Sequence, residues 1–530
     1  MKLPRLRTYL PSAKSIIVAL IAAVMLILAF PDFEIWPLAW FALVPLLTAV
    51  DREKESFARS FVCGWIFGTV FFFGTCWWLA FAPITYAGFP PPLAYSLLFC
   101  VTVGVGLFPA LFAGLLSILL RRLGSVAVLS APFIWVFTEF LRYWITGNNW
   151  NAIGYSQAFS PSLRNLASVG GIALVSFVCA AIGCLVALAA NRFDIRRTAG
   201  AAVFIASTFV FSNFLLNPPQ PSPYDSIKRE SGTVVAVQPN VPMVGLSMGK
   251  WRDLRLRHVG LAEAALARVN ELSGMSGYPK DAFFPTTVIF PESPMNFSYA
   301  DDAEFRHFVT IFAAKNNVDV LFNSAEPDLP NKNYFNSAVL VDTRGNEIAQ
   351  YDKIYLLPFG ESVPEPLQSI VPAFVGSFSY GKKYDLIPLG AAKAGVMICF
   401  ESHFGELSRR YVRDGADVLI EMTNDGYLGP TPVLRQHLAN AVFRAVETNR
   451  PVLRVTNVGI TAYINERGEV IDPTDSYTEA TRVWSISKSD GSQTFYVKYG
   501  DWFAWLCTLV TLILAGLSLR RRSVPAEVVH

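Results

Sequence analysis

The chain has 530 residues, of which 52% are hydrophobic and 16% are charged, and its formal net charge is +3. Soluble globular proteins carry about 25% charged residues, so this composition excludes a disordered chain or a coiled coil and argues against a purely soluble protein. The small net charge, and the lack of basic runs interleaved with aromatic residues, argue against nucleic-acid binding.

Apolar segments dominate the first part of the chain and return at its end. A transmembrane helix needs roughly 20 mostly apolar residues, and the sequence predicts eight such spans: Ser15–Phe30, Trp36–Val50, Phe61–Ala82, Leu93–Leu120, Val126–Ile145, Val169–Ala190, Gly200–Leu216 and Trp502–Leu519. The second span contains Pro45, so a buried or re-entrant segment stays open there. The first resembles a signal peptide but lacks an A-x-A cleavage site, which favours an uncleaved anchor.

Lysine and arginine gather in alternate loops. Basic residues precede the first span, and others follow the second, fourth, sixth and eighth spans, as at Arg121–Arg122 and Arg520–Arg522. The intervening short loops carry almost none, with Arg142 and Arg164 as the exceptions. Positively charged loops stay in the cytoplasm, so this pattern predicts cytoplasmic termini and places the residues from about 217 to 501 outside.

The region between the seventh and eighth spans has a different character. The Pro-rich segment Leu216–Tyr224 is typical of a stiff linker. Short β-rich runs then alternate with helical patterns, which indicates an α/β layered domain. The predicted strands are Thr233–Val237, Thr287–Phe290, Val318–Phe322, Ala338–Val341, Gly395–Cys399, Ala416–Ile420 and Pro451–Val455, and the predicted helices are Trp251–Leu272, Asp301–Lys315, Phe404–Asp414 and Pro432–Asn449.

These patterns predict four parts. Residues 1–216 form a membrane domain with seven transmembrane helices, residues 217–230 a linker, residues 231–495 an external catalytic domain, and residues 496–530 the eighth helix with a cytoplasmic tail.

One cysteine stands apart from the other six. Cys399 is the only thiol in the predicted external domain, whereas the others fall inside predicted spans, where cysteine is a small apolar filler. An unpaired thiol at a strand end fits a nucleophile or a buried filler equally well. A nucleophilic thiol needs a base or a nearby positive charge, and His403 and His437 are two candidate bases.

Carboxylates and a lysine offer a second constellation. Glu292 follows a buried-type strand in VIFPESP, Lys353 and Glu361 share the segment YDKIYLLPFGE, and Glu401 lies two residues after Cys399. Taken one at a time, each is more commonly a solvated rim residue.

Three motifs in order resemble the carbon–nitrogen hydrolase (nitrilase) superfamily. They are FPES at Phe290–Ser293, YDKIYLLPFGE at Tyr351–Glu361 and ICFES at Ile398–Ser402. The whole chain resembles the membrane-embedded branch of that superfamily, the apolipoprotein N-acyltransferases. The resemblance implies eight transmembrane helices that carry an αββα nitrilase-like sandwich on the external face.

The resemblance also implies roles for individual residues. Glu292 matches the general base of the family, Lys353 its catalytic lysine and Cys399 its nucleophile. Supporting or substrate-binding positions are matched by five further residues, namely Glu361, Glu401, Asn336, Trp251 and Tyr427. Trp251 corresponds to a tryptophan of a mobile substrate loop, and Tyr427 stands where the family usually has tryptophan.

Within the membrane, Glu139 and Arg142 match an E-x-x-R pair of the family, and an i, i+3 pair on one helix can neutralise itself. Three apolar segments, Leu356–Phe359, Ile370–Phe378 and Pro242–Trp251, are candidate lipid-facing loops beside the site.

The implied reaction moves a fatty acyl chain from a phospholipid, by resemblance phosphatidylethanolamine, to the α-amine of the N-terminal diacylglyceryl-cysteine of a lipoprotein, the last step of lipoprotein maturation. A thioester on Cys399 links the two halves, no cofactor is implied, and the location is the bacterial inner membrane with a periplasmic catalytic domain. The sequence contains no H-E-x-x-H or CxxC metal motif.

Three alternatives stay open at this stage. They are a membrane-anchored amidase with the same Glu–Lys–Cys residues, a transporter with an accessory domain, and a protease built on Cys399 and His403.

Overall fold

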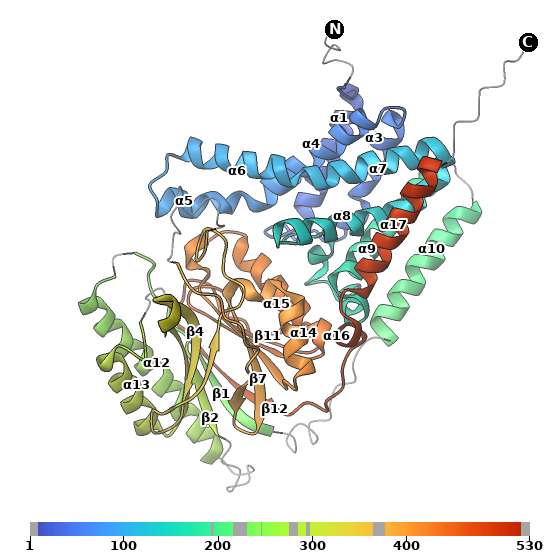
Figure 1. Ribbon diagram of the computed structural model, residues 1–530. Coiled ribbons are helices and arrows are strands. Elements are labelled where there is room, and N and C mark those ends of the chain that lie inside the picture. Colours follow the sequence, from blue (N-terminus) through green and yellow to red (C-terminus); the bar gives the residue numbers. More distant parts are fainter. Residues whose placement is uncertain are drawn as a thin grey trace, which may run out of the picture. The chain divides into compact units, whose positions relative to one another are not determined.

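The computed structural model describes residues 9–191, 195–215, 230–244, 246–274, 285–292, 297–363 and 377–520. The chain separates into two compact units (Figure 1). One comprises Met1–Ile84, Gly88–Leu216 and Asp501–His530, and the other comprises Thr85–Ala87 and Asn217–Gly500. The predicted linker segment Leu216–Tyr224, and the loop Ile370–Phe378 except its last two residues, lie outside the described residues.

The described part of the first unit is helical throughout. Its α-helices are α1 (Ala13–Ala29), α2 (Leu38–Phe41), α3 (Leu43–Glu53), α4 (Phe57–Cys76), α5 (Phe81–Thr85), α6 (Pro91–Val105), α7 (Leu107–Leu123), α8 (Ala131–Thr146), α9 (Ala167–Asn191), α10 (Ile195–Val210) and α17 (Trp502–Arg520). Short 3₁₀ segments η2 (Trp77–Ala80), η3 (Gly124–Ser130), η4 (Ile153–Gln157) and η5 (Arg164–Leu166), and the π-helical turn η6 (Phe211–Leu215), connect or extend them.

Three helical segments of this unit are long and apolar enough to cross a membrane: Phe57–Thr85, Pro91–Thr146 and Arg164–Ala190. Shorter apolar helices lie at Ala13–Ala29, Ala202–Asn213 and Trp502–Ser518. Every predicted span therefore coincides with helix, but a count of eight crossings does not follow from helix length alone.

The predicted span Leu93–Leu120 is two helices rather than one. The chain divides at Gly106 into α6 and α7. A Cβ atom at Gly106 would stand 2.7 Å from Oγ1 of Thr69 on α4, so only glycine permits this close approach.

Glu139 and Arg142 on α8 have separate partners instead of a direct ion pair. The Glu139 carboxylate accepts hydrogen bonds from Trp135 Nε1 and the Ile153 backbone N–H, both at 2.8 Å. The Arg142 guanidinium donates to the Trp150 carbonyl and lies 4.8 Å from the centre of the Phe72 ring. Both side chains tie α8 to neighbouring backbone, as buried polar groups in an apolar bundle require.

The second unit contains two six-stranded sheets. The first has the order β12-β1-β2-β3-β4-β5 and the second the order β11-β10-β9-β8-β7-β6. The strands are β1 (Glu230–Gln238), β2 (Thr286–Ile289), β3 (Asp319–Asp328), β4 (Asn333–Val341), β5 (Glu347–Asp352), β6 (Ile387–Leu389), β7 (Ala392–Ile398), β8 (Val418–Thr423), β9 (Val452–Thr456), β10 (Ala462–Ile464), β11 (Val470–Ile471) and β12 (Ala480–Ser487). All seven predicted strands are present, whereas the short or edge strands β5, β6, β10, β11 and β12 were not predicted.

Each sheet is built around three parallel strands joined by helices. In the first, β1, α12 (Met248–Gly274), β2, α13 (Ala303–Asn316) and β3 follow one another, and β1, β2 and β3 pair in parallel. In the second, β7, α14 (Gly405–Arg413), β8, α15 (Val433–Thr448) and β9 repeat that order. All four predicted helices are confirmed. The remaining helical elements are η7 (Leu329–Asn331), η9 (Cys399–His403), η10 (Asp425–Leu428) and α16 (Phe495–Tyr499).

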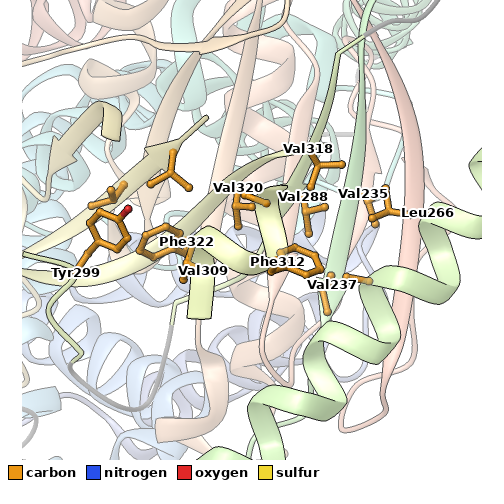
Figure 2. Close-up of a cluster of buried hydrophobic side chains, with 14 of the residues drawn as sticks. Val235, Val237, Leu266, Val288, Tyr299, Val309, Phe312, Val318, Val320 and Phe322 are labelled. Atoms are coloured by element: carbon orange, nitrogen blue, oxygen red, sulfur yellow. The ribbon is translucent and has the colours of Figure 1, made fainter. Parts of the chain in front are cut away.

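A hydrophobic core fills the space between the first sheet and its helices. Val235, Val288 and Val320 of the parallel strands meet Leu266 of α12 and Phe312 of α13 (Figure 2). Helices α14 and α15 pack on the second sheet, and β1 contacts β9 between the sheets. The layers are thus helix, sheet, sheet, helix, which confirms the predicted αββα sandwich.

The carboxyl ends of the parallel strands gather the polar motifs. Glu292 follows β2, Cys399 follows β7, and Asn424 follows β8. In layered α/β proteins this edge is where ligands bind.

Candidate active site

Lys353 is the centre of a buried ion-pair cluster. It follows β5 and is 1% exposed. Its Nζ lies 2.9 Å and 2.8 Å from the two carboxylate oxygens of Glu361 and 3.7 Å from Oε1 of Glu292. Burial lowers the pKa of Lys353, but the two carboxylates outweigh burial and raise the pKa above its usual value, so the cation persists at every ordinary pH.

Asn336 on β4 bridges the two carboxylates. Its Nδ2 donates to Glu292 at 3.0 Å and to Glu361 at 2.6 Å, and its Oδ1 accepts from Asn323 at 2.7 Å. Glu292 also accepts a hydrogen bond from the backbone N–H of Asn424 at 3.1 Å. Both oxygens of the Glu292 carboxylate are therefore held in place by the two sheets.

Cys399 occupies a sharp turn directly after β7. Its φ is +53°, in the left-handed region that non-glycine residues rarely adopt. Such a conformation costs about 1–2 kcal/mol, and the fold maintains it at a half-buried thiol. Strained backbone of this kind is frequent at active sites.

The electrostatic surroundings of Cys399 favour a protonated resting thiol. Burial and the negative charge of Glu292 raise the pKa of Cys399 well above its ordinary value, while Lys353 opposes them. Burial likewise raises the pKa of Glu292, against the opposing charge of Lys353. The arrangement suits proton transfer from the thiol to the carboxylate when a substrate arrives, because the Cys399 thiol forms a hydrogen bond with Glu292.

Glu401 connects the lysine segment to the nucleophile turn and is fully buried. Its Oε1 accepts hydrogen bonds from Tyr351 Oη at 2.8 Å and from the backbone N–H groups of Ile354 and Tyr355 at 2.7 and 3.0 Å. Its Oε2 accepts from the N–H of Ile398 at 2.8 Å. Glu401 thus fixes the chain on both sides of Lys353 and Cys399, and burial raises its pKa to about 7.

Replacing Glu401 with glutamine is expected to destabilise the fold by about 1–3 kcal/mol. The amide NH₂ of glutamine would face the N–H of Ile398 and leave that buried donor without an acceptor. Thermal unfolding of the purified protein measures the effect, with Glu406→Gln on the exposed start of α14 as the matched control. Equal unfolding temperatures for the two variants would show that the Glu401 contacts carry no net stability.

Trp251 and Tyr427 are the two aromatic residues among the predicted site positions. Burial and the negative charges of Glu292 and Cys399 raise the pKa of Tyr427. Trp251 is buried in the first turns of α12 rather than in a loop, and its ring stacks on Phe297 with centroids 4.5 Å apart. The predicted helix Trp251–Leu272 therefore begins slightly earlier, at Met248, and it takes in the last residues of the predicted arm Pro242–Trp251.

An apolar cavity of about 690 Å³, part of it open to solvent, borders the cluster. Glu292 and Trp251 both line it, together with Val259, Phe290, Phe297, Phe305, Val309, Phe312 and Phe322. Among the described residues, Trp251 Nε1 and His258 Nε2 are buried at this cavity without a hydrogen-bond partner. Burial and Arg257 lower the pKa of His258 to about 4, so its ring is neutral.

The two histidines considered as bases have other surroundings. His403 stacks on Phe400 with centroids 5.7 Å apart and packs against Phe404. His437 lies beneath the turn, with Nε2 3.1 Å from the carbonyl oxygen of Cys399 and Nδ1 2.7 Å from Asp425. Glu292, and not His403, forms a hydrogen bond with the Cys399 thiol, which argues against a Cys399–His403 protease.

Two contributions were not predicted from the sequence. The backbone N–H of Asn424 donates to Glu292, and the side chain of Asn323 donates to the bridging Asn336. The T-N-D stretch at Thr423–Asp425 was noted only for the aromatic residues after it. Its position after a buried strand was the available signal.

Among the described residues, no group of three or more histidine, cysteine, aspartate or glutamate side chains could hold a metal ion.

Two family descriptions match the chain. The apolipoprotein N-acyltransferase N-terminal domain matches residues 22–185, and carbon–nitrogen hydrolase matches residues 273–495. An apolipoprotein N-acyltransferase of Geobacter metallireducens is 30% identical over 525 residues, which cover 96% of each chain. Another from Thermotoga maritima is 28% identical and covers 96% of this chain and 94% of its own. An amidase from Nesterenkonia sp. aligns in structure with a TM-score of 0.34 and 13% identity, over 51% of this chain and 94% of its own.

The αββα unit with its buried glutamate, lysine and cysteine is a carbon–nitrogen hydrolase domain. That domain is joined here to an apolar helical region. The chain belongs to the apolipoprotein N-acyltransferase family, and it is accordingly a membrane protein and an acyltransferase.

Proposed function

We propose that this enzyme transfers a fatty acyl chain from a membrane phospholipid to the α-amine of the diacylglyceryl-cysteine at the N-terminus of lipoproteins. One observation carries the proposal: the apolar cavity reaches the buried cluster that surrounds Cys399, because Glu292 lines both. A small polar amide would gain little from such a cavity, whereas an alkyl chain gains about 25 cal/mol for each Å² of apolar surface removed from water.

In the first half-reaction, Glu292 takes the proton of the Cys399 thiol while the sulfur attacks an ester carbonyl of the phospholipid. A C–S bond forms and the ester C–O bond breaks. Lys353 and backbone N–H groups near the turn stabilise the oxyanion. Glu292 then gives its proton to the departing alkoxide, and a lysophospholipid leaves while the acyl chain stays on Cys399 as a thioester.

In the second half-reaction, the free α-amine of the lipoprotein attacks the thioester. A C–N bond forms, the C–S bond breaks, and Glu292 accepts a proton from the amine and returns it to the sulfur. These two half-reactions together constitute ping-pong catalysis with a covalent intermediate. The exclusion of water by the apolar surroundings would protect the thioester from hydrolysis.

The two unpaired polar atoms of the cavity support an ester-bearing occupant. Trp251 Nε1 is a donor, and a buried donor without a partner costs about 1–3 kcal/mol. An ester carbonyl of the lipid would accept from it, and the neutral His258 can donate a second hydrogen bond in the tautomer that carries its proton on Nε2. Phosphatidylethanolamine is the donor that the family resemblance suggests.

Filling the cavity is expected to change which acyl chains are used. Val309 of α13 is 5% exposed and lines the cavity, so Val309→Phe should shorten the space and slow transfer of long chains more than tenfold relative to short chains. The measurement is the rate of lysophospholipid release from a series of phosphatidylethanolamines that differ only in chain length.

The matched control is Leu256→Phe on the exposed face of α12, where the side chain is 65% exposed. It should leave the chain-length profile unchanged. If the rate of lysophospholipid release depended on chain length in the same way for Val309→Phe and for the wild type, the cavity would not be the acyl-chain site. Hydrolysis of small amides without release of lysophospholipid would instead indicate an amidase.

The arrangement in the membrane is also part of the proposal. Residues 1–216 would cross the membrane seven times and residues 496–530 once more, with the linker at residues 217–230 and the catalytic domain at residues 231–495 in the periplasm. The alternating Lys and Arg loops support cytoplasmic termini. Single cysteines added near Arg121 and in the exposed loop at Gly491 should react with an impermeant reagent only at the second position; the reverse pattern would overturn this topology.

A further inference from the structure

Four buried charged side chains lie beneath the turn that carries Cys399. They come from four elements: Glu421 from β8, Asp425 from η10, His437 from α15 and Arg454 from β9. None is more than 4% exposed. Arg454 forms ion pairs with Glu421 and, at 2.7 Å, with Asp425. Nothing in the proposed reaction uses this cluster directly.

His437 is the member of the cluster that touches the nucleophile turn. Its Nδ1 lies 2.7 Å from Oδ1 of Asp425. Its Nε2 lies 3.1 Å from the carbonyl oxygen of Cys399, 3.1 Å from Ser402 Oγ and 3.0 Å from Glu421 Oε1. Each of these four neighbours is an oxygen that can accept a hydrogen bond, so they favour a ring that donates from both nitrogens.

The charges of the cluster favour the same state. With Glu421 and Asp425 ionised and Arg454 positive, a protonated His437 brings the four side chains to zero net charge. Burial lowers the pKa of His437, but Asp425 and Glu421 outweigh burial and raise it to about 9. A neutral ring would leave a buried negative charge next to the sulfur, and Asp425 already raises the pKa of Cys399.

We infer that His437 is a positioning residue for the nucleophile: held by Asp425, it donates from Nε2 to the carbonyl oxygen of Cys399 and keeps that residue in its left-handed conformation. The φ of +53° aims the sulfur out of the strand direction, and the bond to the carbonyl opposes relaxation of the turn. The inference rests on the proposed role of Cys399 as the nucleophile.

The pH dependence follows from the direction of the pKa shift. The folded-state pKa of about 9 exceeds the unfolded value of 6.5, so the stabilisation is fully present below about pH 6.5 and is lost as the pH rises through about 9. The groups that face His437 are Glu421, Asp425, Arg454, Ser402 and the carbonyl of Cys399. Above pH 9 the neutral ring keeps its one proton on Nδ1 and donates it to Asp425. Nε2 then has no proton to donate to the carbonyl oxygen of Cys399.

Two substitutions distinguish the hydrogen bond from Nδ1 to Asp425 from the hydrogen bond from Nε2 to the Cys399 carbonyl. In His437→Asn the amide NH₂ replaces Nδ1 and reaches Asp425, whereas in His437→Gln it replaces Nε2 and reaches the Cys399 carbonyl. Both remove the positive charge equally. We expect the Cys399 thiol of the glutamine variant to be at least tenfold more reactive than that of the asparagine variant. In the wild type the reactivity of Cys399 should decrease as the pH rises through about 9, and neither variant should show this decrease.

The readouts are alkylation of Cys399 by iodoacetamide and acyl transfer to Cys399 from phosphatidylethanolamine, each followed by mass spectrometry beside thermal unfolding. Alkylation does not depend on the lipid, so a wild type that is alkylated but never acylated would refute the proposed function and still test His437. Equal rates for the two variants at equal stability would overturn the inference.

If both His437 variants fail to fold, Ser402→Ala tests whether His437 acts through the Cys399 carbonyl or through Ser402. This small change removes a competing acceptor and leaves the bond to Cys399 in place, so alkylation and its fall near pH 9 should both persist. Loss of the fall in Ser402→Ala would show that the ring acts through Ser402 and would overturn the inference.

Discussion

Incubation of the purified enzyme with phosphatidylethanolamine alone is expected to leave one fatty acyl group on Cys399, in the absence of any lipoprotein. The reason is that the first half-reaction needs only the thiol, Glu292 and Lys353, which the fold brings together before an acceptor arrives. Intact mass spectrometry should show a mass increase equal to one fatty acid minus one water, and hydroxylamine should remove the adduct because the link is a thioester.

Two variants test whether the acyl group is attached to Cys399 and not to another cysteine. Cys399→Ala should give no adduct and should lower acyl transfer by at least 10³-fold, as loss of a covalent nucleophile does elsewhere. Cys100 is the exposed cysteine among the seven, and Cys100→Ala should keep the full adduct. Normal transfer by Cys399→Ser without a trapped intermediate would exclude the thioester route.

Replacing Lys353 with methionine is expected to abolish most activity and to weaken the fold. Removal of the cation leaves Glu361 and Glu292 buried without their partner, and breaking a buried pair in this way costs about 3–5 kcal/mol. The pKa of Glu292 would rise further, because Lys353 is the charge that lowers it. Loss of an oxyanion donor adds a further 10²–10³-fold to the decrease in rate.

The experiment compares acylation rates for equal amounts of folded protein, so that thermal unfolding and catalysis are read separately. Lys383→Met is the matched control, because it removes a lysine that is exposed in the same region of the chain. Acylation by Lys353→Met within threefold of the control would contradict the proposed role of Lys353.

The sequence located the principal chemistry because the relevant signals are local. Strand-end motifs such as VIFPESP and GVMICFES reveal both a buried strand and the polar residue that follows it. Each of the seven predicted strands is present for the same reason: a short, continuous apolar run is a property of neighbouring residues. Edge strands such as β12 escaped prediction because they bury only one face, and their pattern is weaker.

The Trp251 assignment illustrates a limit of reasoning from motifs. The segment before it was expected to be a loop arm, yet Trp251 lies in α12 and packs on Phe297. The helical pattern that begins at Trp251 was visible in the sequence. The contact between Trp251 and Phe297, which lies 46 positions further along, was not visible in the sequence. Packing partners far apart in the chain leave no mark on local composition.

By itself, the sequence determined the apolar helical region and the α/β domain that follows it, and it predicted Glu292, Lys353 and Cys399 as the site. These are matters of composition, period and residue type. Only the tertiary structure decided that Asn336 bridges Glu292 and Glu361, that Glu401 accepts hydrogen bonds from the backbone beside Lys353 and Cys399, and that His437 lies 3.1 Å from the carbonyl oxygen of Cys399. The physical reason is that hydrogen bonds and pKa values depend on distance and burial, and those arise only when strands from two sheets are brought within a few ångströms of one another.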